Sequence, residues 1–192
     1  MTEAAGGRPM SALVVYESMY GNTDGLAHAI ARGIEDVMPV TVENVNHTSA
    51  ISLRTVDLLV VGGPTHLHGL SGQNSRAAAI SSASASLPLD VDAAGTGVRE
   101  WLADITTSAR YFAAFDTRID MPRWMTGAAA PQISRLLRAQ GLEAIVPPED
   151  FLVTDETKLV STELLRATTW GRDLALAASA RLAPPPAAPE QT

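Results

Sequence analysis

Apolar and polar positions follow two different periods along the chain, and stretches of the two alternate. Five short segments have the pattern of β-strands: 12–16, 40–45, 57–63, 111–116 and 142–146. The first, third and fourth are nearly continuous apolar runs, typical of strands buried on both faces, whereas the second alternates like a strand nearer an edge. Pro147 and Pro148 end the last strand because proline cannot donate to a ladder, and we expect Glu149 and Asp150 to form a turn there.

Apolar residues at helical spacing fill most of the intervals between these strands. Four helices are predicted, over about 24–37, 98–105, 133–140 and 164–182. Gly141 is the expected C-terminal cap of the third helix. Ser161 is the expected N-terminal cap of the last helix, with Glu163 in its first turn. The small, polar stretch at 81–97 reads as a weak helix end followed by a loop.

Strands that alternate with helices predict a parallel sheet with helices on both faces. We therefore expect an α/β fold, a three-layer α/β/α sandwich whose five-stranded parallel sheet has the order 2-1-3-4-5. Half of a dinucleotide-binding sheet is the alternative. The domain would span residues 10–182. The Gly-rich start, 1–9, and the Pro-rich end, 183–192, are expected to be disordered tails.

In such sheets a ligand lies beyond the carboxyl ends of the strands, which singles out the turns after the first, third and fourth strands. The first turn, ESMYGNT at 17–23, opens a helix, and a helix start offers free N–H groups to a phosphate. Ser18, Asn22 and Thr23 can each donate a hydrogen bond, and Gly21 permits close backbone approach. Capping of the helix by Asn22 or Thr23 is the alternative. No lysine is present, so this is no nucleoside triphosphate P-loop.

YESMYGNT resembles the phosphate-binding loop of flavodoxins and flavodoxin-like domains. Ser18, Gly21 and Thr23 occupy the fixed positions of that loop, and Met19 and Asn22 fill the positions between. Tyr20 stands where short-chain flavodoxins usually carry Thr, which makes the stretch more similar to the version in flavodiiron proteins. The resemblance spans about residues 11–182. It implies FMN as cofactor, with its phosphate in this loop, and a role in electron transfer.

The second turn, GGPTHLHGL at 62–70, corresponds in this resemblance to the loop beside the flavin ring. The candidate cofactor-binding residues here are Pro64, Thr65, His66, Leu67, His68 and Gly69. Two histidines replace the usual stacking aromatic, and either could stack or carry a proton near the ring. A metal is not expected, because no third ligand accompanies the pair. Solvent-exposed loop histidines are the alternative.

The third turn, FDTRID at 115–120, corresponds to the loop over the outer face of the ring. Phe115, Asp116, Thr117 and Arg118 are its candidate residues, although Phe115 also fits the end of the buried strand. An ion pair between Asp116 and Arg118 is an equally good interpretation. Trp124 either covers the ring as the missing aromatic or packs under the loop.

Composition narrows the possible partners. The 192 residues carry a net charge of −7 with scattered Lys and Arg, which argues against nucleic acid and anionic membranes. There is no cysteine, so disulfides and thiolate chemistry are excluded. No apolar run reaches membrane-spanning length, and the N-terminus lacks the layout of a signal peptide, so a cytoplasmic protein is expected.

The first functional hypothesis is an FMN-binding electron carrier that works with a redox partner protein rather than as a stand-alone enzyme. The second is an FMN-dependent reductase that uses NAD(P)H on a quinone-like acceptor. The third is a flavin-free interaction module on the same fold. The sequence leaves the oligomeric state open.

Overall fold

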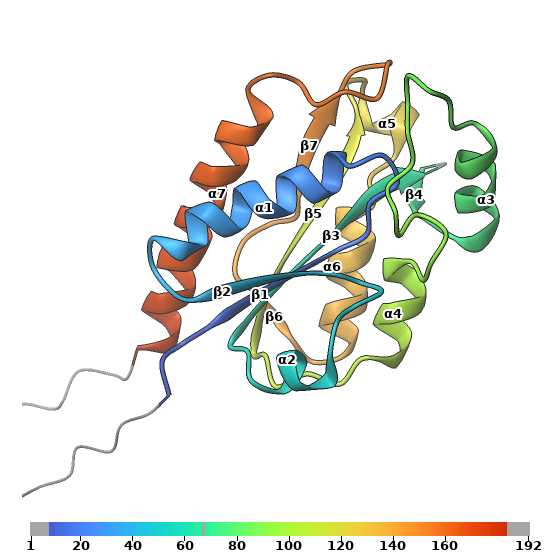
Figure 1. Ribbon diagram of the computed structural model, residues 1–192. Coiled ribbons are helices and arrows are strands. Elements are labelled where there is room, and N and C mark those ends of the chain that lie inside the picture. Colours follow the sequence, from blue (N-terminus) through green and yellow to red (C-terminus); the bar gives the residue numbers. More distant parts are fainter. Residues whose placement is uncertain (1–7, 67, 184–192) are drawn as a thin grey trace, which may run out of the picture.

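The computed structural model describes residues 8–66 and 68–183, which form one sheet between two layers of helices (Figure 1). The strands are β1 (Ala12–Tyr16), β2 (Val40–Asn44), β3 (Leu58–His66), β4 (Gly69–Leu70), β5 (Tyr111–Ile119), β6 (Glu143–Ala144) and β7 (Glu149–Val153). The helices are α1 (Asn22–Glu35), α2 (Ala50–Arg54), α3 (Gln73–Ser81), α4 (Val98–Asp104), α5 (Arg123–Thr126), α6 (Ala130–Ala139) and α7 (Glu163–Leu182). The predicted three-layer α/β/α architecture is confirmed.

The main sheet is parallel and runs in the order β2-β1-β3-β5-β6, which is the predicted order 2-1-3-4-5. Its fifth position is split, because β6 pairs with the start of β5 and β7 pairs with its end. The expectation of a turn at Glu149 and Asp150 is wrong. The two prolines interrupt the ladder, but the chain regains register with β5 directly after them and continues as a strand.

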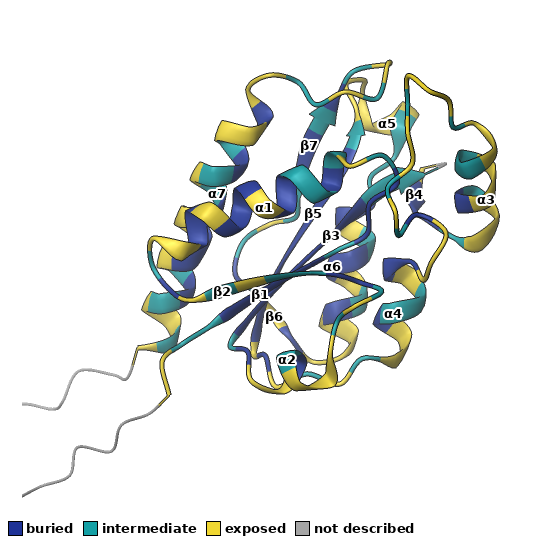
Figure 2. Ribbon diagram, viewed as in Figure 1, coloured by how far each residue is buried: buried dark blue, intermediate teal, exposed yellow. Residues whose placement is uncertain are grey.

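Each face of the sheet buries its own hydrophobic core. In β1, Val14 packs in the core under α1 and α7, and Val15 packs in the core under α4 and α6, as the alternation of a strand dictates. Figure 2 shows the buried residues concentrated in the central strands and on the inward sides of the helices. This double burial explains why the central strands read as continuous apolar runs.

Two glycines let α1 and α7 approach closely. A Cβ added at Gly171 would overlap the carbonyl oxygen of Ile30, and one added at Gly33 would overlap that of Thr168. The pair of helices therefore packs backbone to backbone in the second half of α1, which holds α1 against α7.

The described helices include three that the sequence did not indicate, α2, α3 and α5. The N-cap of α7 is Thr162 and not Ser161, so that expectation is wrong; Glu163 does lie in the first turn, where its carboxylate accepts a hydrogen bond from the N–H of Leu152. Gly141, at φ +89°, follows α6 as predicted.

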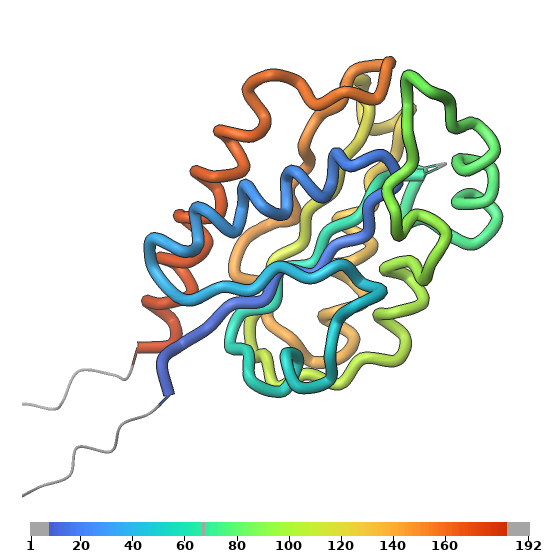
Figure 3. The backbone as a smooth tube through the Cα atoms, in the orientation of Figure 1, coloured from blue at the N-terminus to red at the C-terminus, as the bar shows by residue number. Residues whose placement is uncertain are grey.

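Both ends of the described chain emerge at the lower left of Figure 3, on the side where β1 begins. Most of the two predicted tails, residues 1–7 and 184–192, lies outside the described residues. Arg8, inside the predicted first tail, pairs with Asp57 at 2.8 Å. No described helix combines the length and the apolar character needed to cross a membrane.

Candidate functional site

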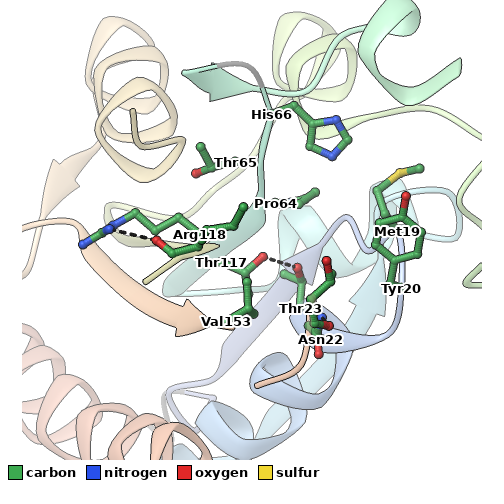
Figure 4. Close-up of a pocket in the computed structure, with 12 residues that line it drawn as sticks. Met19, Tyr20, Asn22, Thr23, Pro64, Thr65, His66, Thr117, Arg118 and Val153 are labelled. Atoms are coloured by element: carbon green, nitrogen blue, oxygen red, sulfur yellow. Dashed lines mark hydrogen bonds between the residues drawn. The ribbon is translucent and has the colours of Figure 1, made fainter. Parts of the chain in front are cut away.

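The carboxyl ends of β1, β3 and β5 surround a cavity of about 140 Å³ (Figure 4). Its walls come from the first turn (Met19, Tyr20, Asn22 and Thr23), the end of β3 (Pro64 to His66) and the end of β5 (Thr117 to Ile119). Val153, the last residue of β7, and Thr157, just beyond that strand, complete it. The three turns selected from the sequence therefore meet at one place.

The first turn leaves the start of α1 without a side-chain cap. Gly21 is the N-cap residue at φ +82°, and its own N–H donates to Ser18 Oγ at 3.0 Å. Asn22 does not cap the helix, because its amide donates to the carbonyl oxygen of Thr157 at 2.7 Å. Within the described chain, the first N–H groups of α1 are left for a ligand.

Hydroxyl groups line the floor of the cavity. Thr23 Oγ1 and Thr117 Oγ1 lie 3.0 Å apart, and both side chains are buried (Figure 4). This hydrogen bond ties α1 to the end of β5, so Thr23 does not cap the helix either. The hydroxyl of Tyr20 donates to the carbonyl oxygen of Ala79, which joins the turn to α3.

Most of the segment expected as the second turn belongs to strands in the structure. Pro64, Thr65 and His66 continue β3, and Gly69 returns in β4 opposite His66. Thr65 Oγ1 accepts a hydrogen bond from the N–H of Ala129 at 2.9 Å, which holds this strand end against α6. Leu67 lies outside the described residues.

The two histidines of this turn face different spaces. His66 lines the cavity, and burial lowers its pKa, so its imidazole is neutral near pH 7. His68, at φ +77°, lines a neighbouring groove. Among the described residues, no three His, Asp or Glu side chains come together as a metal site would require.

Most of the segment expected as the third turn is strand as well, because β5 continues to Ile119 beside β7. Thr117 and Arg118 reach the cavity. Phe115 does not, because its ring packs edge-on against Phe151 and Trp170 in the core.

The ion pair expected between Asp116 and Arg118 is not formed. Arg118 Nε donates instead to Asp150 Oδ2 at 2.7 Å, and Arg123 donates to the same oxygen. Asp116 points toward α6, where its Oδ2 accepts a hydrogen bond from the N–H of Ala130 at 2.7 Å. Asp116 and Asp150 are register partners on adjacent strands, so their side chains share a face.

Both carboxyl groups have perturbed pKa values, in opposite directions. Burial, together with the charge of Asp150, raises the pKa of Asp116 to about 7. Burial alone would raise the pKa of Asp150 too, because it disfavours the charged carboxylate. Hydrogen bonds from Arg123 and Arg118 outweigh burial and hold that pKa below its ordinary value. Neither Asp116 Oδ1 nor Asp150 Oδ1 has a hydrogen-bond partner in the described chain.

Sequence reasoning missed several residues at this edge of the sheet. Ile119, Val153 and Thr157 line the cavity, but the strand that positions the last two was not predicted. It also missed Glu17, whose buried carboxylate accepts the N–H of Val98 at 2.8 Å and so caps α4 from the end of β1. Its place directly after a buried strand was the available signal.

The family profile of flavodoxin matches residues 14–108, which include the first two turns of the site. Over residues 14–108 the chain is therefore similar to the flavodoxin family. This flavodoxin-like chain has no significant match among curated proteins.

Solved structures share its fold at low sequence identity. A flavodoxin from the domain Archaea aligns with a TM-score of 0.60 and 20% identity over 88% of this chain and 99% of that one. The flavodoxin of Streptococcus pneumoniae TIGR4 aligns with a TM-score of 0.58 and 18% identity, over 86% of this chain and 98% of that one. Rubredoxin oxygen:oxidoreductase from Desulfovibrio gigas aligns with a TM-score of 0.59 and 16% identity, over 91% of this chain but only 37% of that protein.

Proposed function

We propose that this protein binds FMN and carries electrons to or from a partner protein. The observation that carries the proposal is the open start of α1, where Gly21 is the N-cap and the hydroxyl groups of Ser18 and Thr23 lie in the same turn. A cytoplasmic location, expected from the sequence, is part of the proposal.

The phosphate would lie in the first turn. The N–H groups that begin α1 have no side-chain cap, and the helix dipole favours an anion there. No atom lies within 4 Å of the position that a Cβ would take at Gly21, so the backbone there is open to close approach. No lysine or free arginine lines this turn, so N–H and hydroxyl donors would hold the phosphate.

The rest of the cofactor would extend from the turn toward the ends of β3 and β5. The enclosed volume is smaller than most ligand pockets, so part of the ring would face solvent, where a partner can approach. His66 would meet the ring as a neutral imidazole that can donate or accept one hydrogen bond. FMN supplies the redox chemistry when bound, and the chain's part is to bind, orient and tune it.

The test is FMN binding by the full chain, followed by absorption and by calorimetry. Ser18→Ala combined with Thr23→Val removes two hydrogen bonds to a charged phosphate. At about 1.5 kcal/mol each, we expect FMN affinity to fall about 100-fold. Ser161→Ala with Thr169→Ala, both exposed and on the α7 side of the molecule, should leave affinity unchanged.

Circular dichroism and the urea midpoint show whether each double variant is folded. Saturable FMN binding that only the first pair weakens supports the proposal. If the wild-type protein does not bind FMN at high concentration, the proposal fails and the turn is only the start of a helix.

A further inference from the structure

The strand β2 forms one edge of the main sheet, and nothing in the described chain pairs with its outer side (Figure 1). It runs from Val40 to Asn44 and matches β1 residue for residue, so it contains no bulge. At the opposite edge the outermost position is divided between β6 and β7. β2 is therefore the edge at which the sheet presents an unbroken strand.

The hydrogen bonds to β1 determine which main-chain groups of β2 point outward. At the start of this ladder, Ala12 N donates to the carbonyl oxygen of Pro39 at 2.9 Å. Successive residues of a strand direct their N–H and C=O groups to alternate sides. Counting from Pro39, Thr41 faces β1, whereas Val40 and Val42 direct both groups to the open edge. No hydrogen bond in the described chain uses the outward groups of these two valines.

Side chains on both faces of this edge are incompletely covered. Val40 and Val42 are half-buried and lie at the margin of the core under α1 and α7. On the opposite face, Thr41 is exposed and lines, with Ile51 of α2, a groove of about 210 Å³. Ile51 is 77% exposed. A strand added to this edge would therefore bury apolar surface as well as satisfy main-chain groups.

The edge is complementary to a second copy of itself. A twofold axis at Thr41 sets two β2 strands antiparallel, with Val40 of each copy opposite Val42 of the other. Each of these pairs can exchange two hydrogen bonds, because both valines direct their N–H and C=O groups outward. A twofold at Val42 would instead need the carbonyl oxygen of Asn44, which already accepts from the N–H of His47. The axis at Thr41 uses only free groups.

Charge does not oppose this register. Glu43 is the only ionisable residue of β2, and it would lie opposite Pro39 of the other copy rather than opposite another carboxylate. Its carboxylate accepts hydrogen bonds from Ser52 Oγ at 2.6 Å and from the N–H of Ser49 at 3.3 Å, so it is held toward α2 of its own chain. At the centre, two threonine side chains would face each other, which is a favourable cross-strand pair.

We infer that this protein forms a twofold dimer through β2, in which the two sheets become one continuous sheet. Antiparallel pairing points the carboxyl ends of the strands in the two copies in opposite directions. The two cavities would then lie at opposite ends of the dimer, each open to a partner. The inference needs no cofactor and goes beyond the proposed function.

The test is sedimentation of the full chain from micromolar to millimolar concentration, combined with amide hydrogen exchange. We expect a monomer–dimer equilibrium in which the N–H of Val42 becomes protected only in the dimer. The N–H of Thr41, which bonds to β1, should be protected in both states. Val42→Pro removes the outward donor without breaking a bond to β1, so the variant should fold but remain monomeric.

Two substitutions of Thr41 test the register, because each places like charges against each other on the twofold axis. Thr41→Glu alone and Thr41→Lys alone should each raise the dissociation constant of the dimer about tenfold. An equimolar mixture of the two should associate at least as tightly as the wild type, since opposite charges then meet. Leu165→Ala, at an exposed position on α7, is the control and should dimerise like the wild type. Circular dichroism and the urea midpoint show whether each variant is folded.

A monomer at every concentration would overturn the inference, and so would a dimer that folded Val42→Pro leaves intact. Protection of the Val42 N–H in a monomer would show that another segment of the chain covers the edge. A mixture of the Thr41 variants that associates no better than either variant alone would refute the register. A dimer that only Leu165→Ala weakens would place the interface on α7. FMN binding by Val42→Pro tests the proposed function separately from the dimer.

Discussion

Asp116 allows the electrostatics beside the cavity to be tested without any cofactor. Its side chain is fully buried, one oxygen accepts from Ala130 and the other has no partner in the described chain. Burial and the neighbouring charge of Asp150 raise its pKa from 3.8 to about 7. In the unfolded chain the carboxyl group returns to its ordinary value, so the folded protein binds this proton more tightly.

The sign of the effect follows from that difference. Between pH 3.8 and about 7 the folded state holds more protons than the unfolded state, so the free energy of unfolding falls as the pH rises. At 1.36 kcal/mol per pKa unit, the ionised carboxylate costs as much as about 4 kcal/mol above pH 7. Asp116→Asn keeps an acceptor for the N–H of Ala130, offers a donor toward Asp150 and has no proton to lose.

The assay is urea unfolding of wild type and Asp116→Asn at a series of pH values. We expect the stability advantage of the variant to grow by about 3 kcal/mol between about pH 5 and about pH 8. Other titrating groups are common to both proteins and cancel in the difference. Asp120→Asn, at an exposed position, is the control and should follow the wild type. Parallel curves for Asp116→Asn and wild type would refute the reasoning.

Two further substitutions test the packing and the second buried carboxyl group. Gly171→Ala should lower the free energy of unfolding by about 1–3 kcal/mol, because the new methyl overlaps the carbonyl of Ile30 and pushes α1 from α7. Gly25→Ala, a helical glycine with no atom nearer than 3.8 Å, is the control, and equal urea midpoints for the two would contradict this account. Glu17→Gln keeps the acceptor for Val98, and because burial raises the pKa of Glu17, the variant should gain stability over wild type as pH rises. The urea series checks this, and a gain that shrinks with rising pH would refute it.

The sequence was sufficient for the fold because the central strands are buried on both faces. Val14, Val60 and Ala113 lie in continuous apolar runs that only such a sheet needs, and helical spacing between them sets the parallel topology. The rule that ligands lie beyond the carboxyl ends of strands then placed Thr23 and Thr117 at one candidate site, and in the structure the two hydroxyl groups are hydrogen-bonded.

The parts of the site that the sequence did not predict depend mainly on one strand, β7. β7 follows two prolines and begins with two acidic residues, so local preference argued against it, and pairing with β5 overrides that preference. Without β7, nothing placed Asp150 beside Asp116, so the partner of Arg118 was wrong. Val153 and Thr157 were missed for the same reason.

The split fifth strand also bears on how the protein avoids aggregation. β6 and β7 lie at one edge of the sheet beside β5, and the end of β7 is covered by the following segment, where Val153 bridges to Leu159. An unbroken edge strand offers a row of N–H and C=O groups to another copy. Here Pro147 and Pro148 remove two donors from the middle of that row. The same interruption that hid β7 from sequence reading thus deprives a neighbouring chain of a continuous template for intermolecular β-pairing.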